Sequence, residues 1–184
     1  MATNAPATLG FLAVVEHQLH GLFGGYLLLN TAGRPLEFHC TAPIKPNRAQ
    51  QILYGPTLQP YLYGEYIGAS LIRASQWSPL VLLVEHETAL AVRAHIELPV
   101  AMVAPPQAPI EPRDTDRPLF HSTGDPLELT IGPNRLRVLR QFATDCQRIV
   151  ERLAADDDWF DFLEPFQRIR GAIEEAQRSI TNAA

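Results

Sequence analysis

Four side chains have the types and spacing that a metal-dependent hydrolase could use: Glu37, His39, His95 and Glu97. Glu37 and His39 lie two residues apart on an extended segment, so they point to the same face of a strand. His95 and Glu97 repeat this spacing on a second extended segment. Imidazole and carboxylate groups bind Zn, Mn or Fe, so this polar face is the enzyme candidate. A solvated sheet face would show the same pattern.

Cys40 directly follows His39, which raises the possibility of a thiol nucleophile with a histidine base. Adjacent residues of a strand point to opposite faces, so these two side chains cannot touch. Leu36 and Phe38 share the face of Cys40 and predict that the thiol points into the core. We therefore expect Cys40 to be a packing residue.

Complete catalytic and cofactor motifs are absent from the chain. The sequence contains no GxxxxGK[ST], GxGxxG, GxSxG, HExxH or CxxC. Cys40 and Cys146 lie far apart and match no zinc or disulfide spacing. The sequence predicts no cofactor and no bound metal, and it favours a protein without catalytic activity.

Four of the five tyrosines fall within residues 47–70. Tyrosine is over-represented among interface hot spots, and Gly64 and Gly68 would allow another backbone to approach closely. The residues predicted to form an interface are Tyr54, Tyr61, Tyr63 and Tyr66. The alternative is that the rings cover the sheet as part of the core, with their hydroxyl groups bonded to the backbone.

Hydrophobic periodicity predicts the strands that position these residues. Nearly unbroken apolar runs at Leu9–His17 and Leu80–His86 indicate buried central strands. Tyr26–Asn30 and Pro35–Thr41 predict a hairpin, and the alternation in Thr88–Val103 predicts a half-exposed strand. We expect an α+β fold with a five-stranded, mainly antiparallel sheet, in the order three strands, a broken helix and two strands.

Helices are predicted between the strands and at the C-terminal end. Asn47 and Gln50 have the spacing of a capping box, so the broken helix should begin there and continue to about Ala74. The apolar residues of Asn134–Ala154 fall on one arc and predict an amphipathic helix. A second helix should begin near Trp159, so the chain should end in a helical hairpin packed on the sheet.

These elements divide the chain into three parts. Residues 1–104 are the predicted sheet body, and residues 105–118 are a proline-rich linker or arm. Residues 119–184 carry the helical hairpin, which we expect to pack on the body as one domain.

Charge distribution guides the choice of partner. Residues 1–104 hold only 5 Lys/Arg and 6 Asp/Glu, well below the ~25% charged residues of an average protein. Surface so poor in charge usually contacts another protein. The alternative is that the chain's own C-terminal helices cover it. The formal net charge of -5 argues against a nucleic acid as partner. Acidic residues also interrupt the basic stripe on the predicted C-terminal helix formed by Arg137, Arg140, Arg148 and Arg152.

The sequence therefore favours a non-catalytic scaffold or adaptor that self-associates, as a homodimer, through the tyrosine-rich broken helix. The alternative is a metal-dependent hydrolase that uses the Glu37, His39, His95 and Glu97 face. The opening residues lack the features of a secretory signal, and no apolar run reaches the ~20 residues that span a bilayer. We expect a cytoplasmic protein with no membrane partner.

Overall fold

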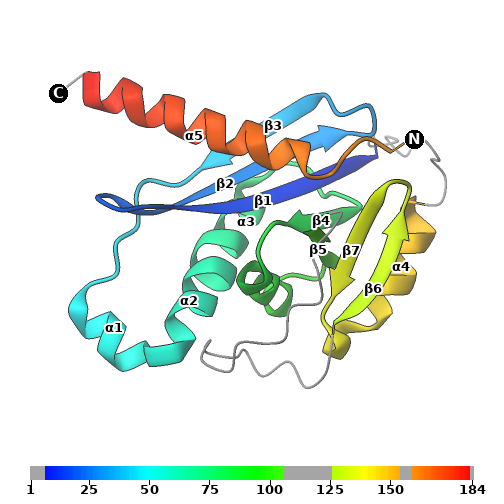
Figure 1. The fold of residues 1–184 in the computed structure, drawn as a ribbon, viewed down its shortest axis with the longest axis horizontal. Coiled ribbons are helices and arrows are strands. Elements are labelled where there is room, and N and C mark those ends of the chain that lie inside the picture. The colour runs from blue at the N-terminus through cyan, green and yellow to red at the C-terminus, as the bar shows by residue number, and fades with distance from the viewer. Residues whose placement is uncertain (1–6, 106–125, 154–158, 183–184) are drawn as a thin grey trace.

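The computed structural model of the protein describes residues 7–105, 126–153 and 159–182. Seven strands of this part form one sheet in the order β3-β2-β1-β4-β5-β7-β6 (Figure 1). The strands are β1 (Thr8–His17), β2 (Gly21–Asn30), β3 (Pro35–Cys40), β4 (Val81–Val84), β5 (Val100–Ala104), β6 (Leu127–Ile131) and β7 (Asn134–Val138).

The sheet is mixed. β1 pairs antiparallel with β2 but parallel with β4, and β4 is parallel to β5. The β6–β7 hairpin then joins the edge of β5 in antiparallel orientation. The predicted five-stranded, mainly antiparallel sheet is therefore wrong, although the fold is still α+β. The two apolar runs predicted as central strands do lie inside the sheet, as β1 and β4.

Two segments account for most of the error. Glu87–Ala94 forms the 3₁₀ helix η3 where a strand was predicted, and only Val100–Ala104 is extended. Asn134–Val138 is a strand where a helix was predicted, because Gly132 takes a positive φ and turns the chain back from β6. Only the later part of the predicted helix is helical, as the 3₁₀ helix η4 (Arg140–Phe142) and the α-helix α4 (Thr144–Leu153).

The broken helix between β3 and β4 consists of five short pieces. They are α1 (Arg48–Tyr54), η1 (Gly55–Thr57), α2 (Leu58–Pro60), the π-helix η2 (Tyr61–Ala69) and α3 (Ser70–Ala74). The predicted capping box is present, since the Asn47 side chain accepts a bond from the Gln50 N–H at 2.8 Å and Gln50 Oε1 accepts one from the Asn47 N–H at 2.9 Å. Gly55 has a positive φ at the break.

Helices cover both faces of the sheet. α4 and α5 (Glu164–Asn182) pack on the face that carries Phe11 and Leu136. η2 and η3 pack on the opposite face, which carries Leu12 and Leu82. These two apolar layers are the core, and α1 extends away from the sheet at one side of the molecule (Figure 1).

The edge strand β3 presents the opposite face to the one predicted. Leu36, Phe38 and Cys40 are exposed, whereas Glu37 and His39 are half-buried. The reason is that Glu37 bonds to the loop after α3 and His39 stacks on Tyr26. The prediction that Cys40 points into the core is therefore wrong.

Most of the predicted proline-rich linker, residues 105–118, lies outside the described residues. Among the helices that are described, none has the length and apolar content required to cross a membrane.

Candidate nucleic-acid interface

The π-helix η2 presents two of the predicted interface tyrosines on its outer side. π-helices are rare and often occur at functional sites. Gly64 lies against the η3 backbone, where an added Cβ would come within 2.7 Å of the Ala91 carbonyl carbon. This close approach holds η2 against η3 and leaves Tyr61 and Tyr66 partly exposed.

Three tyrosine rings form a continuous row, which we call the tyrosine row: Tyr54, Tyr61 and Tyr66. The ring centroids of Tyr54 and Tyr61 are 4.6 Å apart, and those of Tyr61 and Tyr66 are 6.1 Å apart. Tyr54 is 36% exposed and Tyr66 is 50% exposed. A hydrogen bond with Tyr54 and partial burial raise the pKa of Tyr61, so its ring is neutral at physiological pH.

Tyr63, the fourth predicted interface tyrosine, is not part of this row. It packs against the core on the inner side of η2. Burial and the nearby Glu16 carboxylate raise the pKa of its hydroxyl group. The structure therefore places three of the four tyrosines in a row of neighbouring rings, of which Tyr61 is half-buried, and leaves Tyr63 outside the row.

A basic groove runs beside the tyrosine row. A hollow of about 300 Å³ is lined by Lys45, Gln50, Tyr61 and Tyr66, among other residues. Arg48, the first residue of α1, does not line the hollow but lies two residues before Gln50, and no acidic residue occurs between Phe38 and Gly64. This stretch is therefore locally positive in an acidic protein.

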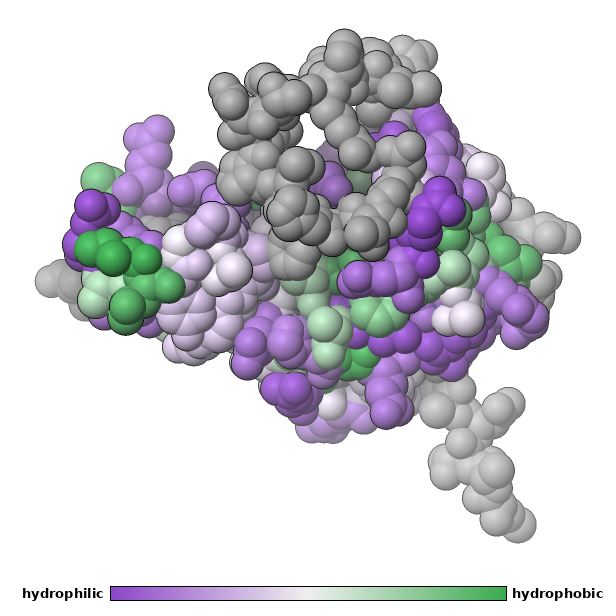
Figure 2. All heavy atoms as spheres, turned by 90° about the horizontal axis from the view of Figure 1, so that it is seen from below, coloured by the Kyte–Doolittle hydropathy of each residue, from purple (hydrophilic) through white to green (hydrophobic). Residues whose placement is uncertain are grey.

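The far end of α1 exposes apolar side chains next to the tyrosine row. Ile52 is 65% exposed and Leu53 is 82% exposed. Figure 2 shows the corresponding hydrophobic surface at the protruding left end of the molecule. Basic, aromatic and apolar groups thus gather on one projecting segment.

The first pair of predicted catalytic residues, Glu37 and His39, belongs to a hydrogen-bonded polar cluster at the edge of the sheet. The Glu37 carboxylate accepts a hydrogen bond from the Ser75 hydroxyl group and one of 3.1 Å from the Gln76 N–H. His39 Nε2 lies 3.5 Å from Glu37 Oε1. Partial desolvation opposes ionisation of Glu37, but the hydrogen bonds from Ser75, Gln76 and His39 outweigh it and lower its pKa.

The second predicted pair lies in the loop after η3 and makes different contacts. The main-chain oxygens of His95 and Glu97 accept hydrogen bonds from Arg73 and Arg148, respectively. The predicted common strand face does not exist, because this segment is helical up to Ala94 and then becomes a loop. In the described part of the chain, no group of three or more His, Cys, Asp or Glu could hold a metal ion.

The carboxyl ends of the parallel strands form another place where ligands commonly bind. Connections leave β1 toward β2 on one side and β4 toward β5 on the other, so β1 and β4 flank a topological switch point. Glu85 follows β4 there, and Arg170 of α5 donates to both of its carboxylate oxygens at 2.5 Å. This carboxylate is thus already held by a cation from the protein itself.

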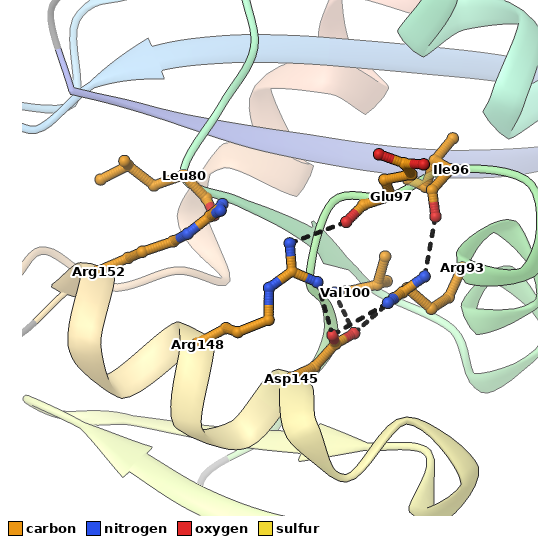
Figure 3. A network of polar contacts seen from close by, with 8 residues as sticks. All are labelled: Leu80, Arg93, Ile96, Glu97, Val100, Asp145, Arg148 and Arg152. Carbon is orange, nitrogen blue, oxygen red and sulfur yellow. Dashed lines mark hydrogen bonds and ion pairs between the residues drawn. The ribbon is translucent and has the colours of Figure 1, made fainter.

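A buried polar network, missed from the sequence, fixes α4 against β5 and η3 (Figure 3). Asp145 is fully buried and accepts bonds from Arg93 Nε at 2.6 Å, Arg148 NH1 at 3.1 Å and the Val100 N–H at 3.2 Å. Arg93 also lies over the Phe142 ring, 4.5 Å from its centroid. The network therefore engages Arg148, which the sequence placed in the basic stripe of the predicted C-terminal helix.

The sheet order and its two helical layers define an α+β fold with a mixed sheet covered on both faces. No protein-family model and no curated protein matches the chain. Among solved structures, a variant of Ciona intestinalis endonuclease V, in complex with a 23mer DNA containing an inosine followed by a ribo-adenosine, is similar. It is 12% identical, with a TM-score of 0.50 over 97% of this chain and 88% of that chain.

Two further structures resemble the chain more distantly. Ciona intestinalis endonuclease V with a 24mer DNA containing an inosine followed by a ribo-adenosine is 11% identical, with a TM-score of 0.47 over 97% of this chain and 89% of that one. Human ENDOV is 13% identical, with a TM-score of 0.42 over 97% and 87%. At 12% identity, the likeness to the first of these structures shows a shared fold and no more.

The comparison corrects the functional hypothesis from the sequence. The chain has the fold of an endonuclease V, and the similar structure contains DNA. The predictions of a self-associating, non-catalytic scaffold and of no nucleic-acid partner are therefore wrong. The alternative hydrolase is wrong in its proposed site, because the four residues do not share a sheet face.

Proposed function

We propose that the protein binds single-stranded nucleic acid along the tyrosine row. The observation that carries the proposal is the continuous, partly exposed contact of the Tyr54, Tyr61 and Tyr66 rings beside a basic groove. Proteins that bind single strands combine aromatic rings, on which bases stack, with positive charge that follows the backbone. Both components are present on this segment.

Single strands suit this surface better than continuous duplex does. A base must be unstacked from its neighbours before it can lie on a tyrosine ring, and single strands already present such bases. The row offers rings at centroid separations of 4.6 and 6.1 Å, so successive bases have neighbouring platforms. The apolar side chains of Ile52 and Leu53 extend the same surface.

Lys45 and Arg48 supply the contacts to phosphate. Both lie in the stretch that contains no acidic residue, and the acidic neighbour of the row is Glu65, whose charge helps to raise the pKa of Tyr61. Each neutralised phosphate of a single strand contributes about -0.7 to the slope of log affinity against log salt. Two contacts predict a slope of about -1.4.

The fold supports the proposal independently of the surface. The similar endonuclease V structure contains DNA, and a shared fold makes nucleic acid a reasonable ligand class for this chain. The proposal concerns binding, because it rests on the stacking surface.

The test is fluorescence anisotropy of a labelled oligothymidylate of ~12 nucleotides, within the usual site sizes for single strands. Tyr61→Ala should weaken binding roughly 5- to 150-fold, since stacking of one base contributes about 1–3 kcal/mol. Tyr61→Phe is the matched control, and it should bind like the wild type because it keeps the ring. Circular dichroism should show that both variants are folded.

Two results would overturn the proposal. One is that the wild-type protein fails to bind the oligonucleotide at low salt. The other is that Tyr61→Ala binds as tightly as Tyr61→Phe does.

A further inference from the structure

The β6–β7 hairpin holds two arginines on one carboxylate. Arg135 NH2 lies 2.9 Å from Glu128 Oε2, and Arg137 Nε lies 2.8 Å from Glu128 Oε1. The Arg135 side chain is 40% exposed, that of Arg137 is 25% exposed and that of Glu128 is 46% exposed. Two guanidinium groups thus converge from neighbouring positions of β7 on a single, solvent-accessible anion.

The strand register places this cluster on the η2 and η3 face of the sheet. Arg137 is the direct partner of Met102 on β5, and Met102 packs against the apolar layer under η2 and η3. Arg135 is two residues away and shares the same face. Leu136 and Val138 point the other way, into the layer covered by α4 and α5.

The same face connects the hairpin to the tyrosine row. A second hollow, of about 140 Å³, is lined by Tyr61, Leu139 and Gln141, among other residues. Leu139 follows β7 immediately. Tyr61 also lines the basic groove, so this ring borders both hollows, one lined by Lys45 and the other by Leu139.

We propose that Arg135 and Arg137 form a second phosphate contact for the strand bound on the tyrosine row, and that Glu128 occupies it when no strand is bound. The inference rests on the proposed function and adds a site to it. The Arg137 and Arg135 donors are already aimed at one anion, and such donors bind phosphate as readily as they bind carboxylate.

A phosphate can displace the carboxylate because the existing pairs are weak. Exposed ion pairs of this kind contribute only about 0.2–1 kcal/mol each. The hydrogen bonds from Arg135 and Arg137 hold the pKa of Glu128 below its usual range, so the carboxylate is charged at neutral pH. It therefore competes with a phosphate at all physiological pH values.

The decisive variant, Glu128→Gln, removes the carboxylate charge that competes with the phosphate. Glu128→Gln should bind the labelled oligothymidylate about three- to tenfold more tightly than the wild type, since two weak pairs no longer oppose the phosphate. Its salt dependence should stay as steep as that of the wild type or become steeper. Glu164→Gln is the matched control, because Glu164 pairs with Arg168 on α5, on the opposite face of the sheet. It removes the same charge and should leave affinity unchanged.

The complementary variant removes a donor. Arg137→Gln should weaken binding and reduce the salt slope by about 0.7, the value for one phosphate of a single strand. If Glu128→Gln and Glu164→Gln have equal affinities, or if Arg137→Gln leaves the slope unchanged, the hairpin site is overturned. The proposed function stands in that case as long as Tyr61→Ala still weakens binding. Loss of all binding by the wild type would overturn both.

Discussion

Replacing Asp145 by asparagine should lower the free energy of unfolding by about 3–5 kcal/mol. Asp145 is fully buried, and its two oxygens face two arginines and the Val100 N–H. Asparagine keeps the size of the side chain but removes the negative charge and presents an NH₂ group to one of these donors. Two cationic side chains would then lack their counter-charge in a largely dry site.

The magnitude follows from the burial of both partners. Removing one member of a buried ion pair costs about 3–5 kcal/mol, because the remaining charge is left uncompensated. The Arg93 side chain is 16% exposed and that of Arg148 is 33% exposed, so Arg93 carries most of the penalty. A domain of ordinary stability has only about 5–15 kcal/mol in total, so the effect should be large.

Urea denaturation followed by circular dichroism measures the change. With a slope of about 2 kcal/mol per molar urea, the midpoint should fall by roughly 2 M. Arg148→Gln provides the comparison, and it should cost about 1 kcal/mol or less, because its guanidinium group is partly in water. A loss below about 1 kcal/mol for Asp145→Asn would refute the view that this network holds α4 to β5.

Two further predictions concern the packing of η2 and the hydrogen bonds of Glu37 on β3. Gly64→Ala should destabilise the protein by about 1–3 kcal/mol, because its Cβ would meet the Ala91 backbone at 2.7 Å. Gly171→Ala on α5, with no atom within 4 Å of its added Cβ, should be neutral or stabilising in the same urea denaturation experiment. Glu37 has a lowered pKa in the folded state, so its stabilising contribution is present above the ordinary value of 4.5 and is lost as the pH falls below it. The difference in unfolding free energy between the wild type and Glu37→Gln should therefore shrink between pH 7 and about pH 3, and a constant difference would contradict the assignment.

The parts of the fold that could be predicted have strong local signals. β1 and β4 are continuous apolar runs. Such a run is typical of a strand that is buried on both faces of a sheet. The Asn47 and Gln50 capping box is a contact between residues three apart, so it depends little on the rest of the chain. In both cases the sequence itself contains the interaction that determines the structure.

The errors arose where two periodicities fit the same residues. Leu136 lies on the apolar arc of a helix, but Leu136 and Val138 also alternate as a strand requires. Pairing with β5 and β6 decides between the two, and such non-local contacts are absent from a local pattern. In Glu87–Ala94, alternation suggested a strand, but packing against η2 made it a 3₁₀ helix.

The tyrosine cluster was recognisable from sequence, but its charged surroundings were missed. Charges were counted over residues 1–104 as a whole, and this average hid the stretch from Phe38 to Gly64 that has no acidic residue. Counting along the chain would have found Lys45 and Arg48 beside the tyrosines. The separation of Tyr63 from Tyr61 follows from their spacing, because residues two apart lie on different sides of a helix.

Net charge was a poor guide to the ligand because charge acts over a limited distance in salt. At physiological ionic strength the screening length is ~8 Å, so acidic residues on distant faces barely affect a strand bound beside Tyr61. Lys45 lines the groove itself, and its charge acts at contact distance. A protein with a formal charge of -5 can therefore bind a polyanion through a small positive segment. Its affinity should depend on that segment's few cations, with the shallow salt slope that two or three phosphate contacts produce.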